Sequence, residues 1–361
     1  MRFTMDTLVY VGTYSTRGSE GIYACRMNRS TGELTPIGAF AAGKNPSFLA
    51  IEPGQRFLYS VSEVSDLDGK PGGGVRAFAV ERESGGLRAL NVQSTRGTGP
   101  CHLSVDSSSR CVLVANYSGG SVTALPVGED GRLGEAACHV QHPAPAIPRE
   151  RQEAAHAHSI MVDPAGSHAL VPDLGLNRIV SYGLDPQRAS LTPHDPPSFE
   201  LHPGAGPRHL AFHPTGRFAY VINELDNTLC AYRYDGDGGL EYLQRLPALP
   251  EGWSGTSYCA DIHVSPDGRH VYGSNRGHDS IVIFAVDEKS GALSLVGHES
   301  TRGNWPRSFA LDPWGTFLYV ANQETDSIVC FARDERSGRL TASGRMLSVP
   351  APCCLKILAP L

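Results

Sequence analysis

One pattern recurs along the whole chain, and it limits the possible folds more than any other feature. Each copy begins with Pro or another small residue, continues with alternating apolar and polar residues, turns, and ends in an aromatic-rich stretch. The copies begin 46 to 57 residues apart, and the last one is truncated. Repeats of this length are typical of propellers and other repeat architectures. The seven copies start at Pro46, Pro100, Ala157, Pro207, Cys259, Pro306 and Pro352.

The repeat unit has the signature of β-strands. Apolar and polar residues alternate, β-branched and aromatic residues are frequent, and no helical periodicity occurs. The links Asp-Pro-Ala-Gly, His-Pro-Thr-Gly, Ser-Pro-Asp-Gly and Asp-Pro-Trp-Gly place Pro early and Gly late, as tight turns require. Each unit holds four short strand patterns. The sequence therefore predicts an all-β fold, a seven-bladed β-propeller with four antiparallel strands per blade, as a single domain over residues 1–361.

The two ends of the chain predict how the ring closes. The segment from Thr7, TLVYVGTYSTRGSEGIYACRM, matches the second and third strands of a unit and lacks a first strand. The segment from Pro352, PCCLKIL, supplies a first strand with nothing after it. We therefore expect the C-terminal strand to join the N-terminal blade, which seals the ring and leaves no free sheet edge.

Charge and composition exclude several classes of partner. The chain has 31 Lys and Arg against 37 Asp and Glu, and it shows no basic stripe, so no nucleic acid is expected as a partner. No run of about 18 apolar residues occurs, so no membrane span is expected. The N-terminus lacks the features of a signal peptide, and the nine Cys show no CxxC motif. We expect a cytoplasmic protein and, because a closed ring has no need to dimerise, a monomer.

Symmetric counting about each turn predicts which residues meet at the open end of the first hairpin in each blade. The first strand of a blade lines the central channel, so these residues should form a ring at one channel mouth. The predicted pairs are Ser47 with Glu63, Cys101 with Tyr117, His158 with Leu174, Arg208 with Glu224, Ala260 with Arg276, and Arg307 with Gln323.

The predicted ring carries more positive than negative charge. Arg208, Arg276 and Arg307 face only two carboxylates at the same level, Glu63 and Glu224. Unpaired charge in a confined site is costly, so the ring favours a carboxylate or phosphate ligand, which Arg binds bidentately. Any single Arg or His here has a structural alternative, tying blades together, and the Asn residues that end the second strands are interpreted mainly as structural. Further polar residues expected nearby are His102, His156, His158, His209, Asn223, Asn275 and Asn322.

One segment breaks the repeat. The stretch QHPAPAIPRERQEAAHAHS from Gln141 contains three Pro and leads into His156 and His158. It is either a loop that contacts substrate at the channel mouth or a plain surface excursion. The His-x-His spacing suits a metal, with Glu224 or His209 as a third ligand, but no Asp-rich set accompanies it and no metal is expected. No G-x-S-x-G elbow, Walker A motif or dinucleotide fingerprint occurs.

The repeat motifs resemble a known family. GPCHLSVD, HAHSIMVDPAG, GPRHLAFHPTGRFAYVINELDNT, SPDGRHVYGSNRGHDSI and WPRSFALDPWGTFLYVANQETDSI are similar to the lactonase family of seven-bladed propellers. This family includes cycloisomerase-type 6-phosphogluconolactonases and carboxy-cis,cis-muconate cyclase. The resemblance implies a catalytic set of His158, Arg208, Glu224 and Arg276, with His156 as an alternative to His158, and it implies no cofactor.

The residues and the resemblance together predict an enzyme that acts on a small anionic lactone or carboxylate. Glu224 or His158 would be the base, and Arg208 or Arg276 would stabilise the oxyanion. The favoured reaction is hydrolysis of 6-phosphogluconolactone. The alternatives are a muconate-type lactonizing cycloisomerase and a non-enzymatic binding propeller, which would show apolar patches on its outer rim. The predicted substrate-binding residues are Arg307, His102, His156, His209, Asn322 and Glu63.

Overall fold

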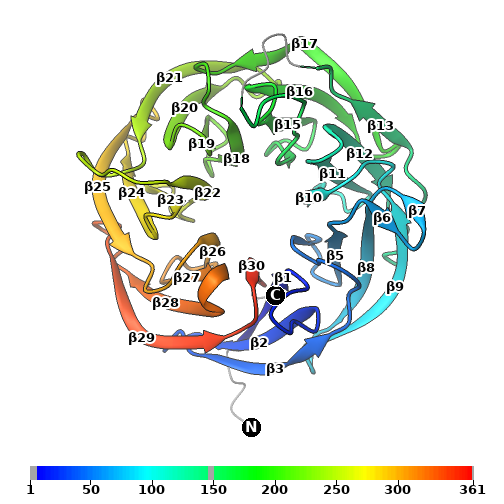
Figure 1. Cartoon of the computed structure of the whole chain (residues 1–361), viewed down its shortest axis with the longest axis horizontal. Coiled ribbons are helices and arrows are strands. Elements are labelled where there is room, and N and C mark those ends of the chain that lie inside the picture. The colour runs from blue at the N-terminus through cyan, green and yellow to red at the C-terminus, as the bar shows by residue number, and fades with distance from the viewer. Residues whose placement is uncertain (1–5, 145–149, 360–361) are drawn as a thin grey trace.

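Seven four-stranded antiparallel sheets surround a central axis, and each forms one blade of a propeller (Figure 1). This computed structural model describes residues 6–144 and 150–359. It confirms the predicted all-β, seven-bladed fold. Within the described residues the only helix is the 3-10 turn η1 (Gln323–Thr325), and no helix is long and apolar enough to cross a membrane.

The first four blades, each given from its inner to its outer strand, are as follows. Blade 1 is β30 (Pro352–Ile357), β1 (Asp6–Thr13), β2 (Ile22–Asn28) and β3 (Leu34–Phe40). Blade 2 is β4 (Leu49–Ile51), β5 (Phe57–Ser62), β8 (Gly74–Glu81) and β9 (Gly86–Ser94). Blade 3 is β10 (Pro100–Val105), β11 (Cys111–Asn116), β12 (Ser121–Pro126) and β13 (Cys138–Gln141). Blade 4 is β14 (Met161–Val162), β15 (His168–Asp173), β16 (Arg178–Asp185) and β17 (Ser190–Glu200).

The remaining three blades follow the same order. Blade 5 is β18 (Pro207–Phe212), β19 (Phe218–Asn223), β20 (Thr228–Tyr234) and β21 (Leu240–Pro247). Blade 6 is β22 (Tyr258–Val264), β23 (His270–Arg276), β24 (Ser280–Val286) and β25 (Leu293–Ser300). Blade 7 is β26 (Pro306–Leu311), β27 (Phe317–Asn322), β28 (Ser327–Arg333) and β29 (Leu340–Ser348). A small hairpin, β6 (Asp66–Leu67) with β7 (Lys70–Pro71), projects from blade 2.

The ring closes as predicted. The C-terminal strand β30 pairs antiparallel with the N-terminal strand β1, with Val9 opposite Ile357 and Gly12 opposite Cys354. Figure 1 shows the red end of the chain beside its blue beginning, at the inner edge of blade 1. One blade built from both ends holds the ring shut through backbone hydrogen bonds.

A repeated hydrogen bond fastens neighbouring blades. A fully buried Tyr in the second strand of a blade donates its hydroxyl to a Gly carbonyl in the outer turn of the next blade; Tyr59 to Gly131, at 3.1 Å, is one case. Gly131 has φ of 78°, and a Cβ there would lie 2.2 Å from the Phe57 ring, so only Gly fits. The buried hydroxyl is thus satisfied while its ring fills the core between blades. The other pairs are Tyr10 with Gly85, Tyr220 with Gly291, Tyr272 with Gly338, and Tyr319 with Gly32.

The hairpin register corrects the predicted cross-strand pairs. In blade 5, Pro207 pairs with Asn223 and His209 pairs with Ile222, so Arg208 is an extra residue in a β-bulge. The backbone of Glu224 consequently lies opposite Gly206, two positions from the predicted Arg208. Symmetric counting missed the bulge, which accounts for one of the two positions. The same two-residue offset applies to Glu63, Tyr117, Leu174, Arg276 and Gln323, which lie opposite Asn45, Gly99, His156, Tyr258 and Trp305.

Candidate functional site

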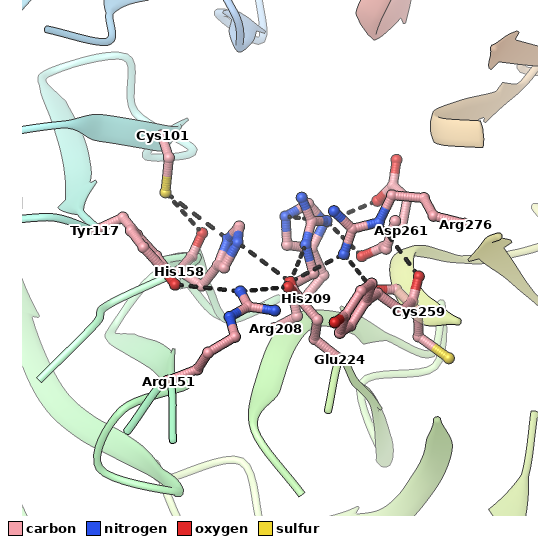
Figure 2. Close-up of polar contacts among 12 residues, drawn as sticks. Cys101, Tyr117, Arg151, His158, Arg208, His209, Glu224, Cys259, Asp261 and Arg276 are labelled. Carbon is pink, nitrogen blue, oxygen red and sulfur yellow. Dashed lines mark hydrogen bonds and ion pairs between the residues drawn. The ribbon is translucent and has the colours of Figure 1, made fainter. Parts of the chain in front are cut away.

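A buried carboxylate that contacts three arginines forms the centre of the channel mouth (Figure 2). Glu224 Oε2 lies 3.1 Å from Arg208 Nε and 3.1 Å from Arg276 Nη2, and Glu224 Oε1 lies 2.7 Å from Arg151 Nη2. The side chains of Glu224 and Arg208 are each only 3% exposed. The predicted contact between Arg208 and Glu224 therefore exists, although the two backbones are not direct cross-strand partners.

The local fold explains how these side chains converge. The bulge in β18 carries Arg208, and bulges commonly re-aim a side chain next to a functional site. Glu224 follows the last residue of β19, while Arg276 ends β23 in the next blade. Arg276 is held by the carbonyls of Tyr258, at 3.2 Å, and Cys259, at 2.9 Å. Two neighbouring blades thus fix the carboxylate and two of its partners.

The electrostatics keep Glu224 ionised. Burial alone would raise the pKa of the Glu224 carboxyl, but Arg276, Arg208 and Arg151 together lower this pKa to about 2. Burial also lowers the pKa of Arg276 to about 10, which still leaves this guanidinium charged at neutral pH. Glu224 is therefore an anion that accepts protons poorly and orients cations well.

His158 lies beside this cluster and is buried. Its Nε2 is 3.7 Å from Glu224 Oε2, and its Nδ1 is 3.7 Å from Cys101 Sγ. Burial, reinforced by Arg208, holds the pKa of His158 well below its usual range. The imidazole is therefore neutral at pH 7 and has a lone pair available. Burial also raises the pKa of the Cys101 thiol, which argues against a thiolate nucleophile at this position.

His156 takes a different place from His158. Its ring stacks on Tyr117 with centroids 4.5 Å apart, and its Nδ1 lies 2.9 Å from the Tyr117 carbonyl oxygen. His158 meets the same Tyr117 ring edge-on, at 5.0 Å. His158, and not His156, contacts Glu224, which supports the assignment that the motifs implied.

Arg307 is the arginine of the mouth with the fewest partners. Its guanidinium lies over the Tyr14 ring, 5.2 Å from the centroid, and it has no hydrogen bond or ion pair with any described residue. Glu63 lies close by, but its carboxylate accepts hydrogen bonds from Tyr14, at 3.0 Å, and from Ser47. Glu63 thus orients the ring beneath Arg307, and the Arg307 donors stay available for an anion.

A second layer lies behind the mouth. His209 Nε2 is 3.1 Å from Arg208 Nη1, and His209 Nδ1 is 2.9 Å from Asp261 Oδ1. His102 is buried between Phe48, with ring centroids 4.2 Å apart, and His209, at 5.3 Å. His102 Nδ1 accepts a hydrogen bond from a backbone amide, so this residue serves mainly as packing below the site.

Asn322 is not brought into the cluster. Its amide is fully buried and donates to the Thr301 carbonyl at 3.1 Å. Asn116, Asn223 and Asn275 bond in the same way to nearby turns and strands, as expected for structural Asn residues. We therefore revise the prediction that Asn322 binds substrate.

Sequence reasoning missed several residues of the site. Arg151 comes from the segment that breaks the repeat; residues 145–149 of that segment lie outside the described part of the chain. Its guanidinium lies over the Tyr258 ring, at 5.3 Å, and Arg276 lies over Trp305, at 5.5 Å. The sequence carries a signal for Arg151, since the break in the repeat allows either a substrate-contacting loop or a plain surface excursion. Asp261 occupies a column that holds Phe, His or Ser in most other blades, and no motif marked it.

The complete mouth carries four guanidinium groups, those of Arg151, Arg208, Arg276 and Arg307. Glu224 pairs with three of them, and Glu63 is engaged by Tyr14 and Ser47. The excess of positive charge is therefore larger than the sequence predicted. Among residues 6–144 and 150–359, no group of three or more His, Cys, Asp or Glu side chains is arranged to hold a metal ion.

Comparison with known proteins agrees with this architecture. The family described as "Lactonase, 7-bladed beta-propeller" matches residues 8–357. The chain belongs to this family. The resemblance seen in the repeat motifs is thus confirmed over almost the whole length of the protein.

Individual relatives share both sequence and shape. A 6-phosphogluconolactonase of Bacillus subtilis strain 168 is 41% identical over 350 residues, which is 97% of each chain. A 6-phosphogluconolactonase of Formosa agariphila is 37% identical and covers 84% of this chain and 86% of its own. The structure of a periplasmic gluconolactonase from Pseudomonas aeruginosa superposes with a TM-score of 0.92 at 35% identity, over 98% of this chain and 99% of that one.

Proposed function

We propose that this protein hydrolyses an anionic sugar lactone, 6-phosphogluconolactone, to the open acid at the mouth of the central channel. The observation that carries the proposal is the excess of arginine around one buried carboxylate, in a family whose named relatives are lactonases. Lactone hydrolysis needs a base for water, a cation for the developing oxyanion and an anchor for the anionic tail. The mouth offers a residue for each task.

We assign the base to His158 rather than to Glu224. Both oxygens of Glu224 are already engaged by arginines, and its pKa of about 2 makes it a weak proton acceptor. His158 is neutral, and Glu224 lies 3.7 Å from its Nε2. As His158 takes a proton from water, the adjacent carboxylate stabilises the imidazolium that forms, which offsets the low basicity that burial imposes.

Two arginines have separate tasks in this scheme. Arg208 is fixed by Glu224 through Nε, and its Nη2 has no hydrogen-bond partner among the described residues, so it is placed to stabilise the oxyanion. Arg307, stacked on Tyr14, anchors the phosphate. One similar structure is named a gluconolactonase, after a lactone without phosphate. No names among these relatives favour the muconate cyclase.

We infer the cellular setting from the cysteines. All nine Cys are free, which supports a reducing compartment such as the cytoplasm, although one structural relative is named as periplasmic. A monomer remains our prediction for the assembly.

The test is hydrolysis of freshly generated 6-phosphoglucono-δ-lactone, corrected for the spontaneous reaction. Glu224→Gln removes the charge that orients three arginines and stabilises the His158 imidazolium, so we expect kcat to fall about 100- to 1,000-fold with a smaller change in KM. His158→Gln is expected to lose turnover to a similar extent.

A matched control makes this test specific. Glu200→Gln is the same chemical change in an exposed pair with Arg178 on the outer strand of blade 4, and it is expected to leave kcat unchanged. Absence of wild-type acceleration would reject this substrate and move carboxymuconates and other lactones forward. Wild-type turnover in Glu224→Gln would remove the channel mouth from the reaction.

A further inference from the structure

A line of hydrogen bonds leads from Arg208 into the channel wall. Arg208 Nη1 lies 3.1 Å from His209 Nε2, and His209 Nδ1 lies 2.9 Å from Asp261 Oδ1 (Figure 2). The His209 and Asp261 side chains are 8% and 7% exposed. Only His209 bonds Arg208 directly, and neither His209 nor Asp261 forms a hydrogen bond or ion pair with Glu224.

The direction of each bond in this line is fixed by chemistry. A guanidinium group only donates, so His209 Nε2 must accept from Arg208. The His209 proton then sits on Nδ1 and is donated to the Asp261 carboxylate, which only accepts. Burial, together with Arg208, lowers the pKa of His209 to about 4, so a neutral ring with a single tautomer is retained at pH 7.

Asp261 is itself held in place. Its Oδ2 accepts hydrogen bonds from Ser308 Oγ, at 2.9 Å, and from the Phe309 amide, at 3.3 Å, and it lies 3.3 Å from His263 Nε2. Its Oδ1 accepts from the Ile262 amide at 3.0 Å as well as from His209. Asp261 lies in the bulge of β22, and its carboxylate bonds His209 of blade 5 and Ser308 of blade 7. A carboxylate with so many donors cannot rotate without losing several hydrogen bonds.

We infer that Asp261 and His209 are positioning residues that fix the orientation of Arg208. Glu224 binds Arg208 Nε, while His209 and the Ala260 carbonyl both bind Nη1. Only Nη2 remains without a partner among the described residues. The acceptor set around Arg208 thus selects which nitrogen faces the reacting lactone; this step rests on the proposed function of the channel mouth.

Asp261→Asn tests the inference because it changes the acceptor for His209 Nδ1 without changing the shape of the side chain. Both carboxylate oxygens of Asp261 accept from two donors, so the Asn side chain offers His209 Nδ1 either an uncharged acceptor or a competing donor. The His209 proton is then held less firmly on Nδ1, and a proton on Nε2 opposes the Arg208 donor. We expect kcat for 6-phosphoglucono-δ-lactone to fall about 10- to 100-fold, with KM changed less.

Two further variants separate positioning from general support of the fold. Ser308→Ala removes one bond to the other oxygen of Asp261 and is expected to keep kcat within about threefold of wild type. His209→Gln keeps an acceptor for Arg208 that does not depend on Asp261. In that background Asp261→Asn should therefore cost less than about twofold, whereas a merely structural role would give the same fold-loss in both backgrounds and overturn the inference.

The inference stays testable if Asp261→Asn does not fold. His209→Phe keeps a ring between Phe48 and the channel but removes the acceptor, and it should lose turnover where His209→Gln retains it. Wild-type turnover in His209→Phe would overturn the inference.

A readout independent of catalysis separates this inference from the proposed function. The 15N shifts of the His209 ring, assigned by comparison with His209→Gln, should report a proton on Nδ1 in the wild type. A proton on Nε2 in the wild type would overturn the inference, whatever the substrate. Absence of lactone hydrolysis with the proton on Nδ1 would instead reject the proposed function alone.

Discussion

Two arginine clusters in this propeller differ in charge balance. Between blades 6 and 7, Arg333 donates to both oxygens of Asp267, at 3.0 and 2.8 Å, to the Tyr272 hydroxyl at 2.8 Å, and to the Gly315 carbonyl at 3.0 Å. Every nitrogen of that guanidinium has an acceptor, and one cation faces one anion. At the channel mouth, three guanidinium groups share Glu224, and Arg307 has no ion pair with a described residue.

The comparison shows that burial of charge alone does not identify a site. A closed pair such as Arg333 with Asp267 completes the structure and needs no ligand. A cluster with an excess of cations and free donors needs an anionic ligand to balance its charge. The repulsion among its cations is offset by the folding free energy of the rest of the protein. The difference in charge balance, rather than the number of arginines, therefore distinguishes the proposed site from a structural ion pair.

We expect the largest effects from the same Arg-to-Met substitution made in each of the two clusters. Arg208→Met keeps the aliphatic stem and leaves Glu224 paired with Arg276 and Arg151, so we expect kcat to fall about 100- to 1,000-fold with little loss of stability. Arg333→Met removes the cation of Asp267 together with the donors to the Tyr272 hydroxyl and the Gly315 carbonyl, so we expect a loss of about 2–4 kcal/mol in the free energy of unfolding with kcat unchanged.

Urea unfolding and steady-state kinetics at 25 °C measure both variants side by side. The comparison is wrong if Arg208→Met unfolds more easily than Arg333→Met, or if Arg333→Met loses turnover while it is still folded. We expect Arg208→Met to lose turnover but not stability, and Arg333→Met to lose stability but not turnover.

Arg307 sharpens the comparison within the mouth itself. Because its guanidinium forms no ion pair with residues 6–144 or 150–359, Arg307→Ala removes an anchor and little else, so we expect KM for 6-phosphoglucono-δ-lactone to rise about 10- to 100-fold with a smaller change in kcat. Glucono-δ-lactone, which lacks the phosphate, should show almost no change in KM. An equal rise for both lactones would contradict a phosphate anchor and place Arg307 at the sugar ring.

Most of the fold was predictable because the same repeat occurs seven times in the sequence. The repeat fixed the blade count, and the unmatched strands near Thr7 and Pro352 predicted closure. The register was not predictable, because the first strands of blades 1, 3, 5, 6 and 7 carry a bulge of one extra residue that no residue type in the sequence indicates. A bulge depends on how a strand fits its neighbours across the channel, and symmetric counting along one hairpin cannot detect it.

The site was predictable only where the repeat itself placed residues at the mouth. Arg208, Glu224 and Arg276 lie in repeat columns, and the structure brings them together. Arg151 lies outside the repeat, and Asp261 contacts His209 from a different blade, so no spacing in the sequence joins them. Asn322 shows the reverse error, because proximity in a column does not tell whether a side chain faces the channel or the turn.

Acid gives the smallest and last test, since it probes the closed cluster alone. Hydrogen bonds from Ser265 and Arg333, against the effect of burial, lower the pKa of Asp267 to about 2. A carboxyl with a pKa depressed in the folded state adds stability above its unfolded pKa of about 3.9, and this contribution disappears as the pH falls toward 2. Asp267→Asn should therefore destabilise the protein by about 1 kcal/mol at pH 7, because the pair is partly exposed, and by progressively less below pH 4.

Urea unfolding at pH 7, 5 and 3 measures this change in stability. Asp130→Asn, which removes the carboxylate of an exposed pair with Arg132, is the control and should show little dependence on pH. A destabilisation by Asp267→Asn that stays constant down to pH 3 would mean that the carboxylate charge is not what closes the Arg333 cluster, and that the contrast with the open mouth rests on hydrogen bonds alone.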